Sequence, residues 1–286
     1  MMKSNTQHDS NPADNISAVS SQNASDLPKT DCSRRFALLF AFFFPVLLTW
    51  VYFDLASQWP LLQKYSYSIG KIIQFGFPAV WILLFYRNYR SVLSLLNCSN
   101  LPKLRDFQAN DNSLNKPFSL LTFLEGIGFG FVIASAMVAV FLITRNLPGF
   151  TEAYAHLEQD LGTRFANLGL RSPIPFIMVG LFYSLIHSGL EEYYWRWFLY
   201  GQLRFCFPAF AAAMIASVGF TLHHIVVLQS YFGITNFLTW LCSFGVCVGG
   251  LYWCWHYQRS GNVLGIWLGH GLIDAAIFVV GYLILF

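Results

Sequence analysis

Long runs of apolar residues limit this chain to a membrane-spanning fold more than any other feature of its sequence. Each run is long enough to cross about 30 Å of hydrocarbon as a helix. Within lipid, helices and closed barrels alone satisfy their backbone hydrogen bonds internally, and apolar runs of this length are typical of helices. The expected segments lie at 36–56, 65–86, 119–143, 173–200, 208–229, 234–255 and 262–286. The sequence therefore predicts an all-α, polytopic membrane helix bundle with seven transmembrane helices.

Composition supports the same class of protein. The 286 residues are 56% hydrophobic and 11% charged, whereas soluble domains carry about 25% charged residues. The net charge of +3 is small, and the basic residues gather at the ends of the apolar segments. This pattern excludes a nucleic-acid-binding surface and makes the lipid bilayer the first expected partner.

Three regions are expected along the chain. Residues 1–33 are rich in Ser, Asn, Asp and Gln, so they are predicted to form a disordered polar tail. Residues 34–118 contain two N-terminal transmembrane helices and the polar linker 87–117. Residues 119–286 form the core, and the interval 144–172 within it has the spacing of an amphipathic helix on the membrane surface. An eighth span hidden in this interval is the alternative.

Short loops make the last four segments neighbours in one bundle. Small residues would let their backbones approach closely, at Ala211–Ala213, at Gly245 and at Gly249–Gly250. Lys and Arg residues are more frequent on the side that holds the N-terminus than on the other side. This bias predicts a cytoplasmic N-terminus in the plasma (inner) membrane.

Charged residues interrupt the fourth apolar segment. Glu191, Glu192 and Arg196 would each oppose insertion by roughly 2.5–3.5 kcal/mol if unpaired. Glu192 and Arg196 are four residues apart with the acid first, which favours an ion pair on a helix. Glu191 points about 100° away from Glu192, so it has no such partner and is free for chemistry. We expect this helix to extend beyond residue 200 towards Phe205.

Further titratable residues lie in the neighbouring segments. His223 and His224 are in the fifth segment, and His270 and Asp274 are one helical turn apart in the seventh. Glu125 in the third segment is expected to be interfacial or paired. A carboxylate and a histidine can activate water and protonate a leaving amine, while a second histidine can stabilise an oxyanion. These groups suffice to hydrolyse an amide bond without a Ser or Cys nucleophile.

Three motifs follow one another in separate segments: Glu-Glu-x-x-x-Arg from Glu191, Phe-x-x-x-His ending at His224, and His-x-x-x-Asp from His270. Their order resembles the CPBP family of intramembrane proteases, which includes the CAAX prenyl endopeptidases and the bacterial Abi-type immunity proteins. The resemblance covers about residues 119–286, and it implies a helical protease core there.

The resemblance also implies roles for individual residues. Glu191 would be the catalytic carboxylate that activates water, with His224 as its catalytic partner. Glu192 and Arg196 would be the supporting ion pair, as their spacing alone indicates. His223 has no place in the motif and is expected to have no catalytic role.

His270 and Asp274 would be the catalytic pair that positions or stabilises the oxyanion. Asp274 stands where the family frequently has Asn, and an aspartate accepts hydrogen bonds but donates one only when it is protonated. The sequence Tyr194–Trp197 is bulkier than the one usual after the paired glutamates, so the substrate entrance is expected to differ.

Two mechanisms fit these residues. The resemblance to glutamate-type members of the family implies water activation without a metal, and this mechanism is favoured; the His-Glu-x-x-His motif of zincins is also absent from the sequence. In the alternative, a metalloprotease, Glu191, His224 and His270 would hold Zn²⁺ with an open position for water. No cofactor is firmly predicted.

The predicted function is that of an intramembrane endopeptidase that cleaves a membrane-associated or prenylated protein or peptide. The alternative is a non-catalytic Abi-type protein that confers bacteriocin immunity or binds a peptide through the same site. A transporter with a proton relay is a further rival, but it predicts inverted repeats, and the sequence shows no convincing halves.

Overall fold

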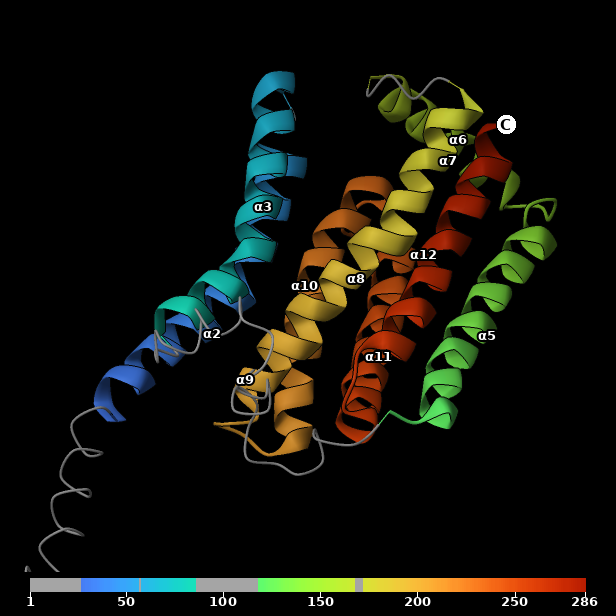
Figure 1. Ribbon diagram of the computed structural model, residues 1–286. Coiled ribbons are helices and arrows are strands. Elements are labelled where there is room, and N and C mark those ends of the chain that lie inside the picture. The colour runs from blue at the N-terminus through green and yellow to red at the C-terminus, as the bar shows by residue number, and fades with distance from the viewer. Residues whose placement is uncertain (1–26, 57, 86–117, 168–171) are drawn as a thin grey trace, which may run out of the picture.

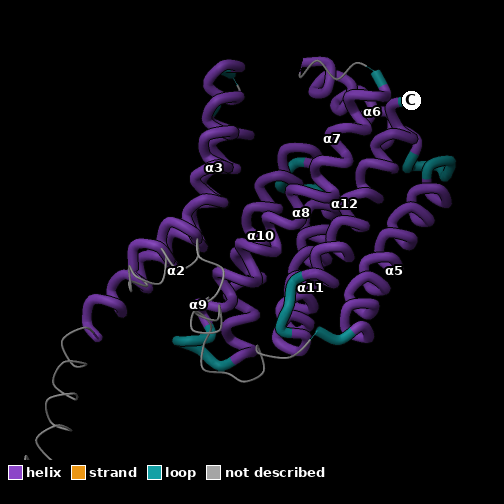
Figure 2. The backbone as a smooth tube through the Cα atoms, viewed as in Figure 1, coloured by secondary structure: helices purple, strands orange, loops and turns teal. Residues whose placement is uncertain are grey.

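The computed structural model describes residues 27–56, 58–85, 118–167 and 172–286, and it is a bundle of helices (Figure 1). No strand occurs in these ranges (Figure 2). The helical elements are α2 (Leu27–Trp50), η1 (Val51–Leu55), α3 (Pro60–Phe85), α5 (Leu120–Thr144), α6 (Thr151–Asn167), α7 (Pro173–Leu181), η4 (Phe182–His187), α8 (Ser188–Glu192), η5 (Tyr193–Tyr200), α9 (Gly201–Leu203), α10 (Ala209–Phe232), α11 (Phe237–Ser260) and α12 (Leu264–Leu285).

In the part of the chain that the structure describes, seven helical stretches are long and apolar enough to cross a membrane, as the sequence predicted. Large apolar side chains cover much of the outside of the bundle; Ile174 and Phe210, for example, are both 75% exposed. A surface of this kind is costly in water and suits lipid. The chain is therefore an integral membrane protein.

The connecting regions agree in part with the sequence analysis. The interval 144–172 contains the predicted amphipathic helix as α6, and it does not contain an eighth span within its described residues. Most of the predicted tail 1–33 and the linker 87–117 lie outside the described residues. Helix α2 begins at Leu27, so the end of the segment assigned to the tail is helical.

The fourth span has an unusual backbone. It runs without interruption over Pro173–Leu203, which confirms the predicted extension beyond residue 200. Two of its parts, η4 and η5, are wound as π-helix and flank the short α8. A π turn changes the partners of backbone carbonyls, and the indole Nε1 of Trp267 on α12 donates to the carbonyl of Leu185 at 2.8 Å. Such turns are frequent at functional sites.

Helices α5 and α12 cross at their backbones. Gly126 and Gly130 on α5 face Gly265 and Gly269 on α12, and a Cβ atom at any of these positions would overlap the facing backbone. Small residues four apart are a common device for close helix contact in membranes. This contact fixes the depth of α12, and therefore of His270, within the bundle.

The glycines that the sequence analysis singled out for close contact are mostly not used in this way. A Cβ atom at Gly245 or Gly249 would have no neighbouring atom within 4 Å. Gly250 does lie against α10, where a Cβ would come 3.1 Å from the Ser217 side chain. The prediction was wrong for the first two because helical periodicity does not say which face of α11 meets a partner.

The two N-terminal helices form a hairpin that packs on the fourth and fifth spans. The Tyr194 hydroxyl donates to the carbonyl of Ala41 on α2 at 3.0 Å. Phe198 contacts Trp81 on α3, with ring centroids 5.6 Å apart. Helices α2 and α3 are thus joined to the span that carries Glu191.

Replacing Gly130 with Ala should destabilise the bundle, because its Cβ would meet the rigid backbone of Gly269. We expect a loss of roughly 1–3 kcal/mol in the free energy of unfolding, as is typical of overpacking. Gly128→Ala is the matched control, since its Cβ would have no neighbour within 4 Å and alanine is the better helix former. Thermal unfolding in detergent would distinguish the two, and equal melting temperatures would contradict the close contact.

Candidate active site

Glu191 lies at the centre of a cluster of histidines. Its side chain is buried, on α8 between the two π-helical segments. Its Oε1 atom is 3.5 Å from Nε2 of His223 on α10 and 4.0 Å from Nε2 of His187, one turn earlier on the same span. Its Oε2 atom is 3.8 Å from Nε2 of His270 on α12. One carboxylate therefore has imidazole groups from three spans around it.

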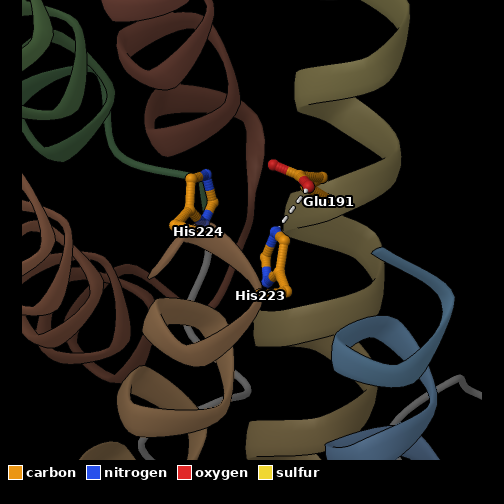
Figure 3. A group of neighbouring side chains, drawn as sticks. All are labelled: Glu191, His223 and His224. Atoms are coloured by element: carbon orange, nitrogen blue, oxygen red, sulfur yellow. Dashed lines mark ion pairs between the residues drawn. The ribbon is translucent and has the colours of Figure 1, made fainter. Parts of the chain in front are cut away.

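The two histidines of α10 differ in their surroundings. Nδ1 of His224 lies 2.8 Å from the carbonyl oxygen of Phe220. Because a carbonyl oxygen can only accept, Nδ1 carries the proton, and Nε2 of the neutral imidazole has a free electron pair. His223 stacks on the Trp195 indole, with ring centroids 5.4 Å apart. Figure 3 shows both imidazoles beside Glu191, with the contact to His223 dashed.

Glu191, His223 and His224 form a group that could hold a metal ion. One ligand atom from each residue lies within 4.8 Å of the others. A carboxylate with two imidazoles is a donor set suited to zinc, and the bond from His224 to the Phe220 carbonyl is the kind that orients a metal ligand. The residues present thus fit a metal in their chemistry.

A second buried carboxylate, Glu192, links Arg196 to His270. Oε1 of Glu192 accepts a hydrogen bond from the Arg196 guanidinium at 2.8 Å and one from Nδ1 of His270 at 2.7 Å. Glu192 is completely buried and Arg196 is 1% exposed. The Arg196 guanidinium also lies over the Phe220 ring, 4.5 Å from its centroid. The ion pair predicted from the spacing is present, and it also holds His270.

Asp274 occupies the outer side of His270. Its Oδ1 atom is 3.7 Å from Nε2 of His270, and its side chain is 18% exposed. With Nδ1 bonded to Glu192, the Nε2 atom of His270 faces both Asp274 and Glu191. The Glu191 carboxylate, the His270 imidazole and the Asp274 carboxylate thus form a continuous polar path, which leads towards the less buried Asp274.

The structure places a further histidine beside Glu191, in addition to His224 and His270 from the sequence analysis. His223, to which no catalytic role was given, is the histidine of α10 that contacts Glu191. The metal set expected from sequence was Glu191, His224 and His270, whereas the group within mutual reach contains His223 in place of His270.

His187 was not recognised as a candidate. His187 and Glu191 are four residues apart, a spacing that places their side chains on one face of a helix, so the contact was within reach of the sequence analysis.

Arg196→Met should destabilise the protein strongly, because it leaves the buried Glu192 carboxylate without its cation. Breaking a buried ion pair costs about 3–5 kcal/mol. Arg259→Met is the matched control: Arg259 pairs with Glu125 at 3.0 Å, but these side chains are 42% and 31% exposed, so we expect about 0–1 kcal/mol. Unfolding in a denaturing detergent measures both, and similar losses would contradict a special role for the buried pair.

Comparison with known proteins was informative for one part of the chain. Residues 173–276 match the family described as type II CAAX prenyl endopeptidase Rce1-like. No curated protein and no solved structure gives a significant match. The matched range begins with α7 and ends within α12, so it encloses every residue of the cluster around Glu191. The histidine-ringed carboxylate therefore lies within the part of the chain that is similar to the Rce1-like family.

Proposed function

We propose that this protein is an intramembrane endopeptidase that hydrolyses a peptide bond of a membrane-associated or prenylated protein or peptide. The observation that carries the proposal is the Glu191 carboxylate, buried inside a transmembrane span with histidines 3.5–4.0 Å away on three spans. Ionisable groups in such a position are costly and are kept for function. The family of the matched domain supports peptide hydrolysis as that function.

In the proposed reaction Glu191 acts as the general base. It removes a proton from a water molecule, whose oxygen then attacks the carbonyl carbon of the scissile bond. The proton passes to the nitrogen of the leaving amine as the carbon–nitrogen bond breaks. His223 and His224 flank the carboxylate and position the water, which extends the role first assigned to His224 alone.

His270 is the proposed group that stabilises the oxyanion. Its Nδ1 atom is fixed by Glu192, which directs Nε2 towards Glu191 and Asp274. A group that is held in place before the reaction stabilises developing charge without a cost of reorganisation. The Asp274 carboxylate, with Oδ1 3.7 Å from Nε2 of His270, favours the imidazolium form of His270 near the oxyanion.

A metal-assisted variant of the same hydrolysis is supported by the triad of Glu191, His223 and His224. A Zn²⁺ ion there would supply a hydroxide nucleophile and polarise the carbonyl group. In that case the three side chains would hold the ion, and His270 with Asp274 would keep the role described above.

Glu191→Gln should abolish cleavage while the fold remains intact, because glutamine has the same shape and cannot accept the proton. We expect kcat to fall by about 10²–10⁴-fold, the usual contribution of a general base. The assay uses purified protein in detergent with a panel of lipidated and unlipidated peptides. Glu158→Gln, at an exposed position of α6, is the control for the loss of one acid.

Full activity in a folded Glu191→Gln protein would refute the proposed base. If neither wild type nor variant cleaves any peptide but both bind one equally, the Abi-type binding function is the better conclusion.

Chelation separates the two chemical routes. The glutamate-type route predicts that purified protein contains no stoichiometric metal and keeps its activity in a strong chelator. Elemental analysis of wild type, His223→Asn and His224→Asn provides the second readout. Zinc bound at one equivalent in wild type and lost in both variants, together with chelator-sensitive cleavage, would instead establish the metal route.

A further inference from the structure

A lysine of the N-terminal hairpin borders the site, although it lies outside the matched domain. Lys71 is on α3, in the second span. Its ammonium group interacts electrostatically with Glu191, and it also acts on His187 and His223. Helix α3 therefore contributes a positive charge to a cluster whose other members come from the C-terminal half.

The face of α3 that carries Lys71 is turned towards the fourth span. Tyr67, Lys71 and Phe75 are spaced by four residues and so lie on one face of the helix. The Phe75 ring is 5.8 Å from the His187 ring, centroid to centroid. The Lys71 ammonium is 5.4 Å from the Tyr67 ring and 5.3 Å from the Phe75 ring. The two rings hold the ammonium beside the histidine cluster.

This ammonium has aromatic contacts and makes no hydrogen bond or ion pair with any residue in the described part of the chain. Cation–π contacts stabilise a lysine, but they do not neutralise its charge. Measured along the helix axis, the Lys71 backbone lies about 15 Å from Leu61, where the span begins, and further from the end of the span. The side chain is therefore too deep for a lipid phosphate to be its natural partner.

A peptide substrate can supply an anionic partner for the Lys71 ammonium. A substrate that carries a carboxylate close to the scissile bond would be repelled by Glu191, and a nearby cation offsets this repulsion. Because Lys71 does not form an ion pair with Glu191 itself, it stays available for such a group. The anions of an unmodified peptide are its C-terminal carboxylate and its acidic side chains.

We propose that Lys71 is a specificity-determining residue that binds a carboxylate of the peptide substrate, on the α3 side of Glu191. This proposal rests on the proposed protease function. It makes the N-terminal hairpin part of the substrate site, and it predicts a preference for peptides that have a negative charge near the cleaved bond.

The test uses three forms of one farnesylated peptide: with a free C-terminus, with an amidated C-terminus, and amidated with a glutamate near the end. Binding of each form to full-length wild type, Lys71→Met and Lys71→Arg is measured in detergent, and kcat/KM is measured alongside. Arg145→Gln, at an exposed position at the end of α5, is the control for the loss of one positive charge.

Wild type should prefer the free C-terminus to the amide by about tenfold, equivalent to about 1.4 kcal/mol. Lys71→Met should lose this preference through weaker binding of the free acid alone, while Lys71→Arg and Arg145→Gln retain it. If the glutamate-containing amide recovers binding, Lys71 binds any carboxylate near the end of the peptide. If it does not, Lys71 binds the C-terminal carboxylate specifically.

Equal binding of acid and amide by wild type would overturn the proposal, as would a preference that survives in Lys71→Met. If Lys71→Met binds all three peptides more weakly by the same factor, the proposal is also overturned. Because binding is measured separately from cleavage, absence of cleavage with intact discrimination would count against the protease function and leave the carboxylate site standing.

Discussion

The buried contact between Glu192 and Arg196 is the interaction on which the site depends. A carboxylate and a guanidinium that are both almost completely buried oppose membrane insertion unless they neutralise each other. Here the pair does more, because the same Glu192 oxygen also binds Nδ1 of His270. One charge pair within the fourth span thereby fixes the orientation of a side chain on the seventh. The close glycine contact between α5 and α12 fixes its depth.

The fourth span then separates two neighbouring carboxylates into two environments. Glu192 is held by a cation and a hydrogen-bonded imidazole, whereas Glu191 is ringed by histidines at 3.5–4.0 Å. Adjacent residues on a helix point about 100° apart, so a tightly bonded side chain and a free one can follow each other directly. His187 lies close to Glu191 because residues four apart on a helix are neighbours, and the stretch between them is the α-helix α8. In the proposed reaction, the surroundings and not the residue type determine which glutamate acts as the base.

The part of the chain outside the matched domain also takes part. Helices α2 and α3 pack against the fourth span through Tyr194 and Phe198, and the same hairpin brings Lys71 towards Glu191. Apolar packing thus brings a second positive charge, from outside the matched residues, near Glu191. The proposed carboxylate site would make this hairpin, which lies outside the matched residues, a determinant of substrate choice.

The sequence by itself determined the class of fold, the seven spans and the charge pair of Glu192 and Arg196, because hydrophobic length and helical spacing are local properties. It also marked Glu191, His224, His270 and Asp274 as candidates, because ionisable residues are conspicuous within apolar segments. It selected His224 and gave His223 no role, although His223 also lies beside Glu191, and it did not find His187 or Lys71. The contacts of His223 and Lys71 depend on the rotation of each helix and on which faces meet. These are decided by packing between residues far apart in the chain, and so by the tertiary structure alone.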